Sequence, residues 1–335
     1  MSALVTPTAR GEISCTQSTL MALDEAMERD PSVLVFGEDV ADREGGGIMG
    51  ATAGLSGKYG DLRVRSTPIA EQAIAGAAVG AAIAGMRPVA EIMMMNFATV
   101  AMDQIVNHAA KIRFMSGGKT GVPLTIRTMS GAGGGFGGQH SDMYEAWLAH
   151  VPGLKVVVPS NPADQMGLLG SCIFDDDPCI FIESTLLMGT KGAAPAAGHR
   201  VPLGKANIVR EGSDVTLIGY GRPMLDAAAA AEALAGEGVS VELIDLRSIV
   251  PFDRETVLNS VAKTGRAVIL HEAVRSFGVG AEISAQINEE LFGQIKAPVR
   301  RIGGPDCPVP FSAALEREYL WSKDKIIDSI RTTLG

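Results

Sequence analysis

Two residues in this chain, Glu71 and His140, have the side-chain chemistry and the local setting of catalytic groups. Glu71 lies in TPIAEQAIAGAAVGAAIAGM, residues 67–86, a segment made mostly of small apolar residues. Thr67 can cap a helix there and Pro68 suits its first position, so we expect Glu71 in the first helical turn. A carboxylate beside such an apolar surface is poorly hydrated, which helps it to exchange a proton with a bound molecule.

The same helix is unusually rich in glycine. Gly76, Gly80 and Gly85 recur along it, although each costs about 1 kcal/mol of helix stability relative to Ala. This density indicates that another segment packs close to the helix backbone. A simpler interpretation of Glu71 is that its charge only complements the helix dipole. A reciprocal capping box is excluded, because the third residue after Thr67 is Ala.

His140 follows the glycine-rich run SGAGGGFGGQHS, residues 130–141. An imidazole in a loop can be partly exposed and can donate or accept a proton near neutral pH, although a lone histidine is often structural. The run lacks the strand-to-helix setting and the ribose-binding acid of a dinucleotide fingerprint. We therefore expect a flexible loop beside an active site. The similar GVGAE at 278–282 is better explained by helix–sheet packing.

The segments around these residues alternate between strand and helix patterns, which predicts an α/β fold with two doubly wound domains. In the first domain we expect strands at 33–38, 87–93, 122–128, 154–159 and 178–184, and helices at 16–30, 98–115, 142–149 and 162–174. In the second we expect strands at 214–221, 239–245, 267–272 and 298–303, and helices at 224–235, 253–263 and 280–292. A Gly, Pro and Ala-rich stretch without periodicity separates them. The predicted boundaries are 1–188 for the first domain, 189–204 for the linker and 205–335 for the second.

Composition excludes several classes of function. The 335 residues are 46% hydrophobic and 20% charged, with a net charge of −9 that disfavours nucleic-acid binding. The longest apolar run, 73–86, is shorter than the roughly 18 residues of a membrane span. The first residues lack a secretory signal pattern, so we expect a cytoplasmic protein. Its cysteines show no metal-binding spacing and are expected to be buried and reduced: Cys15, Cys172, Cys179 and Cys307.

Several motifs together resemble one protein family. They are TPIAEQAIAGAAVGAAIAGMRPVAEI at 67–92, MDQIVNHAAKIRFMSGG at 102–118, GGQHSDMYEAWLAHVPGLKVVVPSNPADQMGLL at 137–169 and IDLRSIVPFD at 244–253. In order and spacing they resemble the beta subunit of the thiamine-diphosphate-dependent decarboxylase component of 2-oxoacid dehydrogenase complexes. The resemblance runs from about residue 12 to the C-terminus. It implies a transketolase-like pyrimidine-binding domain followed by a transketolase C-terminal-like domain.

The resemblance also implies roles for individual residues. Glu71 would hydrogen-bond a pyrimidine nitrogen of thiamine diphosphate and so activate the cofactor. His140 would orient bound intermediates and assist transfer of the acyl group to a lipoyl arm. Phe97 would pack beside the pyrimidine ring, the alternative being ordinary core packing. Gly138 and Asp142 depart from the family's AQHSQ pattern around the histidine, so the contacts of its neighbours differ.

Metal and partner expectations follow from an absent motif. The family's Mg²⁺ site uses a GDG motif, which does not occur in these 335 residues. The resemblance therefore implies that an alpha subunit holds Mg²⁺, in an α2β2 heterotetramer with thiamine diphosphate at the α–β interface. Some relatives bind structural potassium, and that site maps to Leu124, Cys172, Ile173, Asp175 and Asp177. Asp177 replaces an Asn, and a solvated acidic turn is the alternative.

The function predicted is that of the beta subunit of a heteromeric pyruvate or acetoin dehydrogenase. Such an enzyme cleaves a C–C bond or decarboxylates its substrate, and it passes the acyl group to the lipoyl domain of an acyltransferase. A branched-chain 2-oxoacid dehydrogenase is the nearest alternative. A non-catalytic scaffold subunit is an alternative of another class. A self-sufficient transketolase-like enzyme is disfavoured by the missing Mg²⁺ motif, and a nicotinamide-binding domain by the poor fingerprint.

Overall fold

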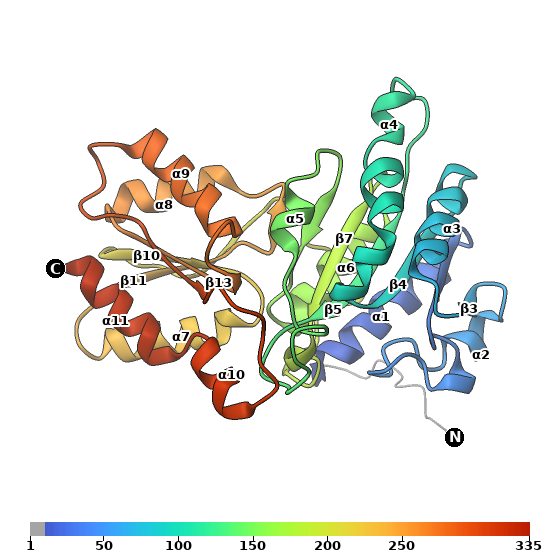
Figure 1. The fold of residues 1–335 in the computed structure, drawn as a ribbon, viewed down its shortest axis with the longest axis horizontal. Helices are drawn as coiled ribbons and strands as arrows, with labels where there is room; N and C mark the ends of the chain where they lie inside the picture. The colour runs from blue at the N-terminus through green and yellow to red at the C-terminus, as the bar shows by residue number, and fades with distance from the viewer. Residues whose placement is uncertain (1–10) are drawn as a thin grey trace. The chain divides into compact units, whose positions relative to one another are not determined.

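The computed structural model describes residues 11–335, which form two compact units. The first unit contains the residues up to Ser130 together with Leu148–Leu203, and the second contains Gly131–Trp147 and Gly204–Gly335. Each unit is a mainly parallel sheet with helices on both faces (Figure 1). The predicted α/β class with two doubly wound domains is therefore confirmed. The prediction about a secretory signal falls on the first residues of the chain, most of which lie outside the described residues 11–335.

The first unit is built on parallel strands in the order β6-β7-β5-β4-β2-β3. Its strands are β1 (Glu12–Ser14), β2 (Val33–Gly37), β3 (Val64–Ser66), β4 (Arg87–Met94), β5 (Thr125–Ser130), β6 (Lys155–Val157), β7 (Cys179–Ser184) and β8 (Lys191–Ala193). Its α-helices are α1 (Cys15–Arg29), α2 (Leu55–Tyr59), α3 (Glu71–Ile83), α4 (Ile112–Met115) and α6 (Pro162–Ile173). Shorter helical segments are η1 (Asp42–Glu44), η2 (Met95–Ala101), η3 (Gln104–Ala109) and η4 (Thr185–Leu187).

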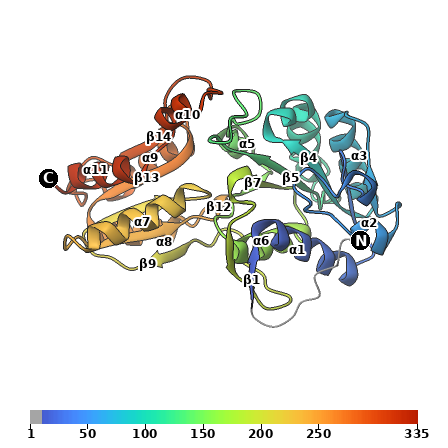
Figure 2. The ribbon, with the colours of Figure 1, turned by 90° about the horizontal axis from the view of Figure 1, so that it is seen from below.

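Helices cover the two faces of this sheet differently. Helices α1 and α6 pack side by side on one face, and α3 lies with the 95–115 helical segments on the other (Figures 1 and 2). Leu23 and Met27 of α1 and Met166 of α6 meet the sheet in one buried cluster with Val35 and Phe181. Burial of large apolar side chains on this scale is the main source of stability for such a layer.

The start of helix α3 differs from the prediction. Ala70, not Thr67, occupies the N-cap position, and no side chain caps the helix. The Thr67 hydroxyl instead donates to the carbonyl of Pro68, at 2.9 Å, so the predicted cap was wrong. The helix begins at Glu71, which still lies in the first turn as expected.

Two further segments differ from their predicted form. The predicted helix at 98–115 is helical over most of that span but changes from 3-10 to π to α geometry. Part of the stretch expected to be a linker forms strand β8, which pairs antiparallel with β1. The paired residues are about 180 positions apart in the sequence. A local sequence pattern therefore cannot predict that they pair.

The second unit has strands in the order β14-β13-β10-β11-β9, of which only β9 runs antiparallel to its neighbour. Helices α8 and α9 cover one face and α7 and α11 the other (Figures 1 and 2). The strands are β9 (Asn207–Arg210), β10 (Val215–Gly219), β11 (Val241–Asp245), β12 (Ser248–Val250), β13 (Ala267–Val274) and β14 (Arg300–Gly304). The helices are α5 (Glu145–Ala149), which begins in this unit, α7 (Pro223–Ala235), α8 (Arg254–Thr264), α9 (Val279–Leu291), α10 (Ala313–Tyr319) and α11 (Lys323–Leu334).

The predicted burial of the cysteines holds for three of them. Cys15, Cys172 and Cys179 are buried and unpaired, whereas Cys307 is exposed, so the prediction was wrong there. Cys307 lies between β14 and α10, in a proline-rich connection at the surface. No helix within residues 11–335 is long and apolar enough to cross a bilayer.

Candidate active site

The predicted site residues of the first unit lie along one edge of its sheet. Strands β4, β2 and β3 are parallel neighbours, so their carboxyl ends meet at the same edge. Glu38 directly follows β2, Glu71 follows β3 through a short connection, and Phe97 follows β4. In open parallel sheets the loops at the carboxyl ends of strands are where ligands bind. The topology therefore gathers these three side chains at the edge suited to a site.

Glu38 and Glu71 form an acidic pair that is almost removed from water. Their exposed fractions are only 6% and 8%. Burial first, and then the charges of Glu71, Asp39 and Glu91, raise the pKa of Glu38. Sequence reasoning missed Glu38, although an acidic residue at the end of a buried strand was a signal that could have identified it.

One oxygen of Glu38 lacks a partner. Its Oε1 atom is buried and accepts no hydrogen bond from any residue within 11–335. Buried polar atoms are almost always hydrogen-bonded, so an acceptor without a donor needs an explanation. A ligand with hydrogen-bond donors on a flat heteroaromatic ring, such as an aminopyrimidine, fits an edge that carries this acceptor and the Glu71 carboxylate.

Phe97 lies on 3-10 helix η2, which packs against the helix that begins with Glu71. It is half-buried against a sulphur-rich apolar cluster that includes Cys15, Met94 and Met129. Burial, followed by the charge of Glu183, raises the pKa of the Cys15 thiol to about 12, which keeps it protonated and inert. Glu71 and Phe97 thus lie on two elements that pack against each other, α3 and η2.

His140 lies in the other unit, in the segment 131–147. Strand β5 ends at Ser130 and the chain then enters this segment, which belongs with the C-terminal residues. The imidazole is half-buried, and the backbone N–H of His140 donates to the carbonyl of Gly137 at 3.2 Å. Just beyond it, the Tyr144 hydroxyl donates to Asp142 at 3.0 Å.

A second acidic network lies deep in the first sheet. Arg127 of β5 forms ion pairs with Glu91 of β4 and Glu183 of β7, and all three are almost fully buried. Glu183 also accepts hydrogen bonds from Thr19, at 2.7 Å, and from Gln165, at 2.5 Å. Burial raises the pKa of Glu91 and Arg127 opposes that effect. The network ties β4, β5 and β7 to α1 and α6.

Four of the five predicted potassium ligands lie at the end of α6 or in the turn that follows it: Cys172, Ile173, Asp175 and Asp177. The fifth, Leu124, directly precedes β5. Oxygens of all five residues are already engaged, however. Arg87 donates to the carbonyls of Asp175, at 2.9 Å, and Ile173, at 3.4 Å. The carbonyl of Leu124 accepts from the backbone of Cys179, and that of Cys172 accepts from the backbone of Asp175.

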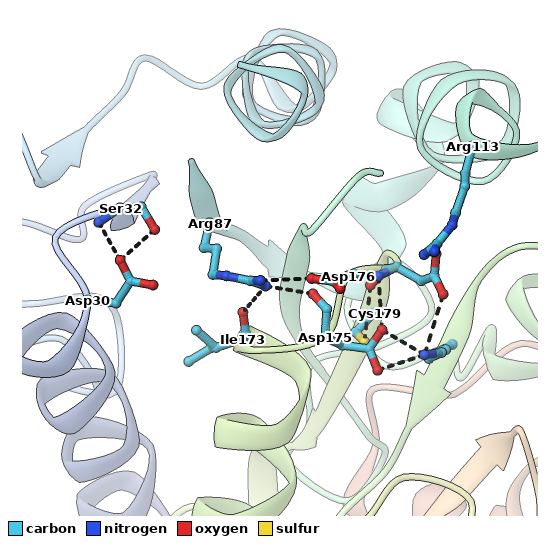
Figure 3. A network of polar contacts seen from close by, with 10 residues as sticks. Asp30, Ser32, Arg87, Arg113, Ile173, Asp175, Asp176 and Cys179 are labelled. Carbon is cyan, nitrogen blue, oxygen red and sulfur yellow. Dashed lines mark hydrogen bonds and ion pairs between the residues drawn. The ribbon is translucent and has the colours of Figure 1, made fainter. Parts of the chain in front are cut away.

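Basic side chains also hold the carboxylates of this set. Lys155 Nζ lies 2.6 Å from both carboxylate oxygens of Asp175, and Arg113 lies 2.6 Å from Asp177. Figure 3 shows Arg87 and Arg113 reaching this acidic turn from two sides. Basic side chains thus contact oxygens of Ile173, Asp175 and Asp177, and backbone N–H groups contact those of Leu124 and Cys172. The potassium site stays a prediction. Within residues 11–335, no group of three or more His, Cys, Asp or Glu side chains could hold a metal.

Comparison with known proteins agrees with this architecture. The pyrimidine-binding domain of transketolase matches residues 11–190, and the transketolase C-terminal domain matches residues 204–326. The beta subunit of acetoin:2,6-dichlorophenolindophenol oxidoreductase from Cupriavidus necator is 46% identical, over 93% of this chain and 95% of that protein. Pyruvate dehydrogenase E1 component subunit beta-2 from Oryza sativa subsp. japonica is 45% identical, over 95% of this chain and 85% of that protein.

The chain belongs to the beta-subunit family of the acetoin and 2-oxoacid dehydrogenases. The predicted recognition and enzyme class are thereby confirmed: it is a beta subunit of the thiamine-diphosphate-dependent, heteromeric oxidoreductase type. Another similar family member is the 2-oxoisovalerate dehydrogenase beta subunit from Chaetomium thermophilum, 47% identical over 86% of this chain and 62% of that protein. A solved structure titled split gene transketolase, inactive beta4 tetramer, has a TM-score of 0.77 at 23% identity, over 97% of this chain and 99% of that one. That likeness supports the fold.

Proposed function

We propose that this beta subunit supplies the pyrimidine-binding half of a thiamine diphosphate site in a pyruvate or acetoin dehydrogenase. The observation that carries the proposal is the buried pair of Glu38 and Glu71 at the carboxyl edge of the sheet, with an unpartnered acceptor on Glu38. A carboxylate in that setting is suited to hold a proton against a ring nitrogen of a bound ligand. When bound, thiamine diphosphate supplies the carbon nucleophile that attacks the substrate carbonyl and stabilises the resulting carbanion.

The roles proposed for the chain's own residues are those that the family resemblance implies. Glu71 shares a proton with a pyrimidine nitrogen and so controls the tautomer of the cofactor. Phe97 packs against the ring from the neighbouring element and excludes water. His140 orients the substrate-derived group and moves a proton during transfer of the acyl group to a lipoyl arm.

The other components of the site are assigned to partners. An alpha subunit would hold Mg²⁺ and the diphosphate, since no GDG motif occurs in the sequence. The assembly would be an α2β2 heterotetramer that delivers its acyl group to the lipoyl domain of an acyltransferase. The C-terminal domain would mediate beta–beta contact and docking to the acyltransferase. A cytoplasmic location stays a prediction.

The experiment is a substrate comparison on the chain co-purified with its alpha subunit. Thiamine-diphosphate-dependent reduction of 2,6-dichlorophenolindophenol would be measured with pyruvate, acetoin and a branched-chain 2-oxoacid in parallel. We expect activity with pyruvate or acetoin that is lost in Glu71→Gln and retained in Gln72→Ala, its exposed neighbour. Equal activity in Glu71→Gln would instead support a scaffold subunit, and activity without the alpha subunit a self-sufficient enzyme.

A branched-chain substrate is the second candidate. It is favoured by the 47% identity to the Chaetomium thermophilum 2-oxoisovalerate dehydrogenase beta subunit. The substrate comparison above distinguishes the two candidate functions. A branched-chain dehydrogenase would have its highest kcat/KM with the branched 2-oxoacid, whereas a pyruvate or acetoin dehydrogenase would have its highest value with pyruvate or acetoin.

A further inference from the structure

The segment that carries His140 is held by side chains that lie far away in sequence. Residues 131–147, here the His140 segment, are glycine-rich at their start and have no regular structure before α5. A segment of this kind has high conformational entropy and would not present an imidazole in one orientation by itself. What fixes it must come from the rest of the second unit.

Glu316 of helix α10 makes the central contact. Its carboxylate accepts the backbone N–H of Gly133 at 2.8 Å and that of Gly135 at 3.1 and 3.0 Å to its two oxygens. The Glu316 side chain is buried, with 2% of the residue exposed. Hydrogen bonds from N–H groups to an ionised carboxylate are about twice as strong as those between neutral groups. One side chain therefore clamps the segment at two points, five and seven residues before His140.

Glu272 and Arg222 add a second clamp, on the residue just before these glycines. The backbone N–H of Ala132 donates to Glu272 at 2.7 Å, and its carbonyl accepts from Arg222 at 2.8 Å. Both backbone polar groups of Ala132 are thereby satisfied by side chains. Such contacts define the rotation of the peptide planes on either side.

The backbone nearest His140 is confined by packing. Gly137 has a φ of +71°, and a Cβ atom built there would lie 2.3 Å from the Phe311 ring. The ring therefore lies directly against the backbone three residues before His140. Five residues after His140, the buried Glu145 accepts a hydrogen bond from the Tyr220 hydroxyl at 2.7 Å. His140 thus lies, along the chain, between two points that are fixed by contacts.

We propose that Glu316 is a positioning residue for His140: its buried carboxylate fixes the glycine-rich start of the His140 segment and thereby sets the orientation of the imidazole. The proposal rests on the role given to His140 above. Glu316 contacts no reacting atom in this scheme, and it acts only through the backbone that leads to His140. Through Glu316 alone, helix α10 thereby helps to position His140.

The test is a double-mutant cycle on the complex with the alpha subunit, using pyruvate and acetoin as substrates and 2,6-dichlorophenolindophenol as acceptor. Glu316→Gln keeps the size of the side chain but turns an amide donor toward one backbone N–H. We expect kcat to fall about tenfold to a hundredfold, with a smaller change in KM, since small displacements of a catalytic group have effects of this order. Glu316→Asp, which keeps the charge but shortens the reach, should act in the same direction. Glu318→Gln, exposed on the same helix, should match wild type.

The cycle separates positioning from general stability. If Glu316 acts through His140, then Glu316→Gln should add nothing in a His140→Ala background. A multiplicative loss in the double variant, or full activity in Glu316→Gln, would overturn the proposal. Full activity in His140→Ala would overturn it too, while Glu71→Gln would report separately on the thiamine site itself.

A readout independent of activity is backbone hydrogen exchange. In wild type the amides of Gly133 and Gly135 should be protected, and peptides covering 131–147 should exchange faster in Glu316→Gln but not in Glu318→Gln. Unchanged exchange in Glu316→Gln would show that the carboxylate does not hold the segment, and would overturn the proposal whatever the substrate of the enzyme.

Discussion

Glu38 and Glu71 follow neighbouring parallel strands and act on each other electrostatically within a nearly dry sheet edge. Burial and then the charge of Glu71 raise the pKa of Glu38. The Glu71 carboxylate disfavours ionisation of Glu38, which destabilises the fold unless a ligand relieves it. Proteins retain unfavourable pairs of this kind mainly at functional sites.

Glu38→Gln should separate function from stability. The variant removes a buried charge and its repulsion with Glu71 while keeping the side-chain volume, so we expect thermal stability at pH 8 to be equal or higher. Activity of the complex should fall, because the unpartnered Oε1 acceptor is lost or reoriented. Differential scanning fluorimetry and the acceptor assay measure the two. Lower stability with full activity would mark Glu38 as a structural carboxylate.

Arg127→Met should be severely destabilising. It would leave Glu91 and Glu183 buried without their counter-charge, a change that costs about 3–5 kcal/mol in comparable sites. Arg113→Met is the matched control, because the ion pair of Arg113 with Asp177 is largely exposed and such pairs contribute little. Urea unfolding of both variants tests this. Similar midpoints for the two would contradict the assignment of the buried network as a structural centre.

Local sequence patterns predicted the strands and helices of each layer, but they did not predict the contacts between distant segments. Alternating strand and helix patterns placed β2, β7 and β13 within about two residues of their observed bounds. The glycines of GVGAE were expected to serve helix–sheet packing, and Cβ atoms built at Gly278 and Gly280 would lie within 3.0 Å of the His271 ring. Hydrophobic periodicity and small residues are local features, so they can be recognised in a single sequence.

Two features lay beyond local signals. Strand β8 forms only because Lys191–Ala193 meets β1 across the first unit, and its own residues have no strand pattern. The His140 segment lies between first-unit strands in sequence but belongs with the second unit, through contacts such as those of Glu316. Glu71, Phe97 and His140 were proposed from motifs, and their roles stay predictions. Glu38 was missed although it follows a predicted strand, and the structure adds that its side chain is itself buried.

Stability should depend on pH through Glu272. Burial raises its pKa from 4.5 to about 7, against the opposing effects of Ala132 and Arg222. A carboxyl group whose pKa is raised in the folded state contributes stability below the unfolded pKa and loses it as pH rises through the folded pKa. Wild type should thus lose stability relative to Glu272→Gln between about pH 4.5 and 7, by up to about 3 kcal/mol. Denaturant titrations at pH 5 and 8 measure this, and a constant difference would contradict it.

The thiols should differ sharply in reactivity. Cys307 is exposed, whereas Cys15, Cys172 and Cys179 are buried, and burial raises the pKa of both Cys15 and Cys172. We expect one thiol to react rapidly with Ellman's reagent in the folded chain and all four in guanidinium. Cys307→Ser should abolish the rapid phase. A rapid phase that persists in this variant would show that a buried thiol is accessible.

The glycines of α3 provide a test of assembly. Gly80 lies on an exposed part of the helix, and a Cβ atom there would meet nothing within 4 Å. Gly80→Ala should therefore stabilise the separate beta chain by about 1 kcal/mol. Gly85 lies just beyond the end of α3, which the structure places at Ile83. Gly85→Ala should have the opposite effect, because Gly85 has a φ of +94° that only glycine adopts without strain.

The heteromer should respond to Gly80→Ala in the opposite direction to the separate chain. A helix with glycines at this density pays a cost in stability that is explained if a partner subunit packs against its backbone. We therefore expect Gly80→Ala to weaken association with the alpha subunit or with a second beta chain, measured by sedimentation velocity over a dilution series. If association is unchanged while the separate chain is stabilised, the glycine serves no close contact, and the glycine-rich pattern of α3 has no role in assembly.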